Sequence, residues 1–78
     1  MTVEGEPLSV ENLSFEEARA ELEKIVAELE SGRAGLDDAV RLWERGEALY
    51  RHCVGKLDAA EGKIEELGRR AEAVRPEA

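Results

Sequence analysis

The chain is poor in cysteine, histidine and aromatic residues, and each shortage excludes a class of structure. Its 78 residues include a single cysteine, Cys53, which cannot form an internal disulfide and fits a reducing compartment. A structural zinc site takes about four cysteine or histidine ligands, and Cys53 and His52 are the only such residues here. Only Phe15, Trp43 and Tyr50 are aromatic, and a chain this small often needs staples or assembly for stability. We expect neither a metal nor a cofactor.

Basic charge and long apolar runs are also scarce. The 19 acidic and 11 basic residues give a net charge of −8, whereas contact with nucleic-acid phosphates needs clustered lysine and arginine. No apolar run is longer than three residues, far short of a membrane span. The acidic, proline-broken start "MTVEGEPLSV" is unlike a signal peptide. The composition predicts a soluble cytoplasmic protein that binds neither nucleic acid directly nor a membrane.

Local signals place the first helix after a loose N-terminal segment. Residues 1–13 show no helical period and are predicted to be a flexible arm. Ser14 can cap a helix, and Glu17, three residues later, completes a capping box. Gly32 is suited to end the helix. The first helix is therefore predicted over residues 14–31.

Apolar residues recur at alternating steps of three and four, a spacing typical of coiled-coil packing. The seam of the first helix consists of Phe15, Ala18, Leu22, Ile25 and Leu29. After a turn, the spacing resumes in a second helix predicted over 36–67, with Leu36, Ala39, Trp43, Gly46, Tyr50, Cys53, Leu57, Ala60, Ile64 and Leu67, and it extends to Ala71 and Val74. Since no segment alternates with period two, we predict an all-α antiparallel αα-hairpin with a coiled-coil-like seam and a longer second helix. Residues 68–78 are a tail whose helicity is left open.

Gly46 lies inside the predicted second helix, where glycine costs roughly 0.5–1 kcal/mol relative to alanine. In a hairpin that turns between the two helices, Leu22 faces Gly46, so large residues meet small ones along the seam. Gly46 is therefore predicted to make room for Leu22. The alternative is a glycine that is merely tolerated. The predicted hairpin core comprises the first-helix seam together with Ala39, Trp43, Gly46, Tyr50 and Cys53.

The second helix extends beyond the first, which covers it only as far as Cys53. The stripe continues with Leu57, Ala60, Ile64 and Leu67. We expect these four residues to bind another subunit. The alternative is that the N-terminal arm, through Leu8, Val10 and Leu13, folds back over them.

No catalytic residues are predicted. His52 and Cys53 are neighbours on a helix and point about 100° apart, so they do not face each other as a thiol–imidazole pair. We expect Cys53 to be a buried small residue and His52 to lie on the surface. Di-iron bundles use Glu-x-x-His pairs, and no glutamate precedes His52 by three residues.

Residues 14–67 resemble the small subunit of bacterial exodeoxyribonuclease VII. The resemblance is carried by the Phe-Glu-Glu start at 15–17, "LEKIVAELESG" at 22–32, "LDDAVRLWERGEALYRHC" at 36–53 and "KLDAAEGKIEEL" at 56–67. The turn departs from the family pattern, with "RAGL" in place of a sequence closer to acidic–Leu–Pro–Leu. The arm and the tail lie outside the resemblance.

The resemblance implies a non-catalytic subunit that binds the large catalytic subunit, with several small subunits on helical parts of each large one. The enzyme of this family cleaves single-stranded DNA from both ends, first to large acid-insoluble oligonucleotides and then to small acid-soluble ones. The nuclease chemistry and the DNA-binding domain belong to the large subunit.

Three other readings remain open at this point. The chain could be a self-assembling helical protein whose seam extensions pair between identical copies. It could be an acidic DNA mimic that blocks a basic protein, in which case binding would weaken steeply with salt. Activity of the chain as an enzyme by itself ranks last.

Overall fold

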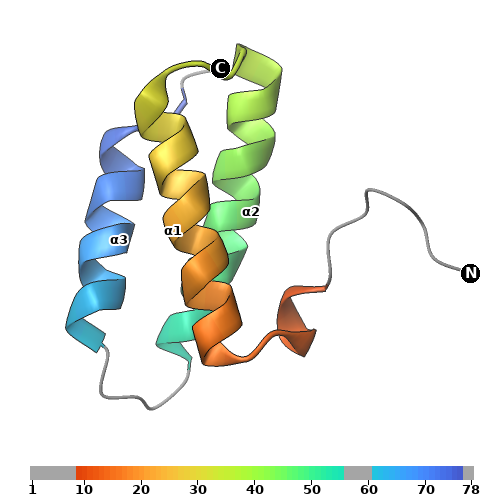
Figure 1. Ribbon diagram of the computed structural model, residues 1–78, viewed down its shortest axis with the longest axis vertical. Coiled ribbons are helices and arrows are strands. Elements are labelled where there is room, and N and C mark those ends of the chain that lie inside the picture. Colours follow the sequence, from red (N-terminus) through yellow and green to blue (C-terminus); the bar gives the residue numbers. More distant parts are fainter. Residues whose placement is uncertain (1–8, 56–60, 77–78) are drawn as a thin grey trace, which may run out of the picture.

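A computed structural model describes residues 9–55 and 61–76, which form three α-helices (Figure 1). A short 3₁₀ helix, η1 (Val10–Asn12), precedes α1 (Phe15–Ser31), α2 (Leu36–Val54) and α3 (Glu61–Ala73). Helices α1 and α2 are antiparallel, and α3 runs back beside both of them (Figure 1). The all-α antiparallel hairpin is confirmed, with 17 residues in α1 and 19 in the longer α2.

The capping signals of α1 are confirmed. The backbone N–H of Glu17 donates to the Ser14 hydroxyl oxygen at 3.1 Å, and the Glu17 carboxylate accepts from the Ser14 N–H at 2.9 Å. At the other end Gly32 adopts a left-handed conformation with φ of 72° and donates its N–H to the carbonyl of Leu29. Glycine adopts this conformation without the steric cost that a Cβ imposes, so the helix ends here.

The continuous helix expected over 36–67 is replaced by two helices. Helix α2 ends at Val54, and α3 begins at Glu61 and packs against α1 and α2. The physical reason is burial: Ile64 and Leu67, expected on an uncovered stripe, are only 1% and 2% exposed within the chain. Burying each leucine or isoleucine contributes roughly 1.5–3 kcal/mol. Helix α3 also continues to Ala73, into the segment expected to be a tail.

The core is wider than the predicted two-helix seam. Val26 and Leu49 lie off that seam yet have no exposed surface, whereas Leu36 lies on it and is 55% exposed. A helix that packs against two neighbours needs a broader apolar stripe than a two-stranded seam does. Helix α3 adds Ile64 and Leu67 to the core. The buried cluster comprises Leu13, Phe15, Ala18, Leu22, Ile25, Val26, Leu29, Leu49, Cys53, Ile64 and Leu67.

The predicted contact between Leu22 and Gly46 is confirmed. A Cβ atom at position 46 would lie 3.5 Å from Leu22 Cδ1 and 3.3 Å from Ile25 Cγ2. Gly46 is itself buried. The missing side chain is therefore what allows α1 and α2 to approach closely at this layer.

Residues 9–13, expected to belong to a flexible arm, pack against the helices instead. Leu13 is 7% exposed and lies in the core cluster, and Val10 packs against it. Nε2 of His52 lies 2.8 Å from the Leu13 carbonyl oxygen. Because a carbonyl only accepts, the ring nitrogen donates in this hydrogen bond. The half-buried His52 thus anchors the N-terminal segment to α2 and is not simply a surface residue.

Candidate functional site

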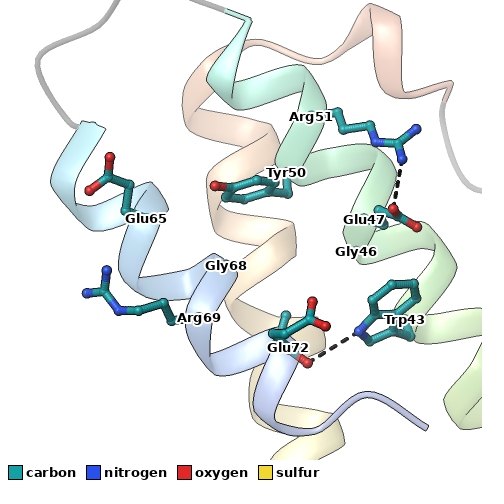
Figure 2. Close-up of a pocket in the computed structure, with 10 residues that line it drawn as sticks. Trp43, Gly46, Glu47, Tyr50, Arg51, Glu65, Gly68, Arg69 and Glu72 are labelled. Atoms are coloured by element: carbon teal, nitrogen blue, oxygen red, sulfur yellow. Dashed lines mark hydrogen bonds and ion pairs between the residues drawn. The ribbon is translucent and has the colours of Figure 1, made fainter. Parts of the chain in front are cut away.

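A groove of about 480 Å³ lies between α2 and α3 (Figure 2). We call it the α2–α3 groove. It is lined by Trp43, Gly46, Glu47, Tyr50, Arg51, Glu65, Gly68, Arg69, Ala71 and Glu72. Its aromatic side chains come from α2 and reach toward α3 (Figure 2).

Tyr50 and Gly68 set the distance between the two helices. A Cβ atom at position 68 would lie 2.5 Å from Cε1 of Tyr50, closer than real Cβ atoms approach other carbons. Only glycine at position 68 therefore lets the backbone of α3 lie against the tyrosine ring. Position 46, on the opposite side of the groove, is also glycine.

Trp43 closes the other end of the groove. Its indole Nε1–H donates to the backbone carbonyl of Ala71 at 3.3 Å (Figure 2). The guanidinium carbon of Arg75 lies 4.9 Å from the centre of the indole ring, within range of a cation–π interaction. Trp43 remains only half-buried. The indole is therefore held in place yet keeps a face at the surface.

The rim of the groove carries charges of both signs. Arg51 donates to Glu47 along α2 at 2.8 Å, and Arg75 lies 3.5 Å from Glu72. An aromatic floor with a charged rim is the usual composition of a protein–protein contact surface, in which tryptophan and tyrosine often contribute most of the binding energy. The groove has the chemistry of an interaction surface.

Two bidentate ion pairs join the helices away from the groove. Arg45 of α2 binds Glu21 of α1 at 2.8 and 3.0 Å, and Arg70 of α3 binds Glu30 of α1 at 3.0 and 2.7 Å. The hydrogen bonds that Arg70 donates lower the pKa of the Glu30 carboxyl, and the hydrogen bonds that Arg45 donates to Glu21 raise the pKa of Arg45. The first pair orients α2 relative to α1, and the second orients α3 relative to α1.

The Glu30–Arg70 pair makes the stability of α3 depend on pH. Because the pKa of Glu30 is lowered in the folded chain, its contribution is complete above the unfolded pKa of about 4.3 and is lost as pH falls through the lower folded pKa. We expect Glu30→Gln to melt below wild type at pH 6, and we expect this difference to shrink as the pH falls below the unfolded pKa of Glu30. Thermal melts followed by circular dichroism measure this difference, and a gap that stays constant with pH would contradict it.

Cys53 and His52, the two side chains considered for chemistry in the sequence, lie in different environments. Cys53 is 1% exposed within the apolar core, and the ring of His52 is engaged by the Leu13 carbonyl. Among residues 9–55 and 61–76, no group of three or more histidine, cysteine, aspartate or glutamate side chains could hold a metal ion. In the same part of the chain, no helix combines the length and apolar character needed to cross a membrane.

The residues predicted for the hairpin core and for partner binding differ in how far the structure buries them. Phe15, Ala18, Leu22, Ile25, Leu29, Gly46 and Cys53 are buried, and Ala39, Trp43 and Tyr50 are half-buried. Ile64 and Leu67 are covered inside the chain rather than presented to a partner. Leu57 and Ala60 lie outside the described residues. The groove thus unites Trp43 and Tyr50, predicted for the hairpin, with residues of α3.

The sequence pattern did not predict that residues of α3 line the groove. It includes Ala71 as an extension of the seam, but the position of Ala71 against Trp43 depends on how α3 folds back. Gly68 carried no signal, because a glycine that permits close approach to a tyrosine cannot be distinguished from one that ends a helix.

Comparison with known proteins places the chain in a family. The family model described as "Exonuclease VII small subunit" matches residues 15–66. An exodeoxyribonuclease 7 small subunit from Phenylobacterium zucineum is 50% identical over 63 residues, covering 81% of this chain and 79% of the relative.

Other relatives agree. The protein of the same name from Rhizobium leguminosarum bv. trifolii is 52% identical over 67 residues, covering 86% of this chain and 80% of the relative. That from Caulobacter vibrioides is 51% identical over 61 residues, covering 78% and 73%. No solved structure matches significantly. The resemblance noted in the sequence is confirmed, and the chain belongs to the exonuclease VII small subunit family.

Proposed function

We propose that this chain is the non-catalytic small subunit of an exodeoxyribonuclease VII and works in the cytoplasm bound to the large catalytic subunit. Several copies bind each large subunit. The complex degrades single-stranded DNA from both ends, first to large acid-insoluble oligonucleotides and then to small acid-soluble ones.

The observation that carries this proposal is the family match over residues 15–66, together with about half of the aligned positions identical to relatives of that name. The net charge supports the assignment of DNA binding to the large subunit. With a net charge of −8 the chain is a poor ligand for DNA phosphates. We assign the nuclease chemistry to the large subunit, as the family resemblance implies.

The proposal is tested by mixing the chain with the large subunit encoded in the same genome. Size-exclusion chromatography with light scattering at rising ratios is expected to give a saturating complex with more than one small subunit per large one. Single-stranded DNA is expected to be degraded by the complex and not by the small chain alone. Separate elution of the two proteins at micromolar concentration, or cleavage by the small chain alone, would contradict the proposal.

We place the contact with the large subunit at the α2–α3 groove. Ile64 and Leu67, the described part of the stripe first assigned to partner binding, are covered within the chain. The groove instead presents half-buried Trp43 and Tyr50 beside a charged rim. Because its floor is apolar and aromatic, binding there is expected to tolerate salt, whereas a DNA mimic would lose affinity steeply.

Filling the groove is expected to weaken the complex. Ala71 lines the groove and Ala73 does not, although both lie on α3, and Ala73 is exposed. Ala71→Leu should lower the affinity for the large subunit by about tenfold or more, because the new side chain occupies space that the partner would use. Ala73→Leu is the matched control and should bind normally. Titration by calorimetry measures both, and equal affinities would move the contact away from the groove without affecting the proposed function.

A further inference from the structure

The C-terminal end of α3 is tied to Trp43 through its backbone. The Ala71 carbonyl oxygen accepts the Val74 N–H at 3.1 Å and the indole Nε1–H of Trp43 at 3.3 Å. The last carbonyls of a helix lack the usual partner within the helix, so a side-chain donor from another element stabilises such an end. The Trp43 indole is this donor, and it fixes where the chain leaves α3.

Residues 74–76, which we call the C-terminal strap, lead from the end of α3 onto Trp43. Val74 is half-buried and packs against the core cluster. The guanidinium carbon of Arg75 lies 4.9 Å from the centre of the Trp43 ring, within the range of a cation–π interaction. The strap therefore places a charged side chain over an aromatic ring that lines the α2–α3 groove.

The C-terminal strap is held more weakly than α3 itself. Nη1 of Arg75 lies 3.5 Å from the Glu72 carboxylate, and these side chains are 61% and 66% exposed. The Arg70–Glu30 pair that holds α3, by contrast, is bidentate at 3.0 and 2.7 Å and is 38% exposed on both sides. Exposed ion pairs contribute little to stability, and a cation–π contact is weak at an exposed site. The strap can therefore leave Trp43 while α3 stays in place.

A molecule that binds over Trp43 has to bury the strap or move it aside. Burial would remove water from the Arg75 guanidinium, and the Glu72 carboxylate at 3.5 Å is too distant to replace that water with a good hydrogen bond. Moving the strap aside gives up only its weak, exposed contacts and leaves the guanidinium hydrated. Displacement of the strap is therefore favoured over its burial.

We propose that the C-terminal strap is a reversible cover of Trp43 that a binding partner displaces. In the closed form Arg75 occupies a face of the indole ring. In the open form that face is free to contact an apolar side chain of the partner, as tryptophan commonly does at the centre of an interface. The cover is a property of this chain alone, whereas its displacement by the large subunit rests on the proposed function.

Fluorescence of the isolated chain tests the cover, because Trp43 is its only tryptophan. Acrylamide, a neutral quencher, should quench Arg75→Gln about twofold more strongly than wild type, since the cation–π contact no longer holds the strap closed. Arg33→Gln removes the same charge from the exposed turn between α1 and α2 and should behave as wild type. Equal quenching in all three proteins would overturn the proposal.

Calorimetric titration with the large subunit tests the displacement. Arg75→Gln should bind about threefold to tenfold more tightly than wild type, because the partner no longer has to move the strap, and Arg33→Gln should bind as wild type. Lower or unchanged affinity of Arg75→Gln would overturn the displacement. Failure of all three proteins to bind would refute the proposed function and displacement by this partner together, while the quenching result would still decide whether the strap covers Trp43.

Discussion

Replacing Leu49 with alanine is expected to lower the free energy of unfolding by about 2–5 kcal/mol. Leu49 has no exposed surface, so truncation removes buried apolar area and leaves a cavity in the core shared by the three helices. A domain of this size is only marginally stable, so a loss of this magnitude removes a large fraction of its free energy of unfolding. Urea denaturation followed by circular dichroism measures the change.

Leu36 provides the matched control, because it is the same residue type in the same helix. It lies on the predicted seam but is 55% exposed, so Leu36→Ala should change the free energy of unfolding by less than about 0.5 kcal/mol. A simple two-helix hairpin built on the seam would give the opposite order. Equal costs at the two positions would contradict the burial of Leu49 in the core.

Gly68→Ala is expected to lower the free energy of unfolding by about 1–3 kcal/mol. Alanine normally stabilises a helix interior relative to glycine, but here its Cβ would lie 2.5 Å from Tyr50 Cε1. The tyrosine ring or the whole of α3 must move to relieve the clash. Chemical denaturation gives the size of the effect, and near-ultraviolet circular dichroism follows the displacement of Tyr50 and Trp43.

Gly46→Ala separates the clash from the change in helix propensity. It makes the same chemical change in a helix, but its Cβ would lie 3.3 Å from Ile25 Cγ2, a contact that a small shift can relieve. We expect a smaller cost than at Gly68. The double variant Gly68→Ala with Tyr50→Ala should lose less than the sum of the two single changes. Strict additivity would show that the tyrosine ring is not what excludes a side chain at position 68.

Local signals in the sequence determined the ends of the first helix, the register of the hairpin seam and the family. The Ser14–Glu17 capping box and the Gly32 stop both act over a few residues, and both are present. The seam placed Leu22 against Gly46 because the spacing of apolar residues and the position of the turn together set which residues face each other. The quoted sequence stretches were also sufficient to identify the family.

Only the tertiary structure decided what covers the second half of the seam. Apolar spacing specifies which side of a helix avoids water but not which element covers that side. A long helix bound to a neighbour and a helix that folds back satisfy the same pattern through Ile64 and Leu67. The burial of Ile64 and Leu67 within the chain and the fit of Gly68 against Tyr50 follow from the second arrangement. Both depend on contacts between residues far apart in the chain, which local periodicity does not encode.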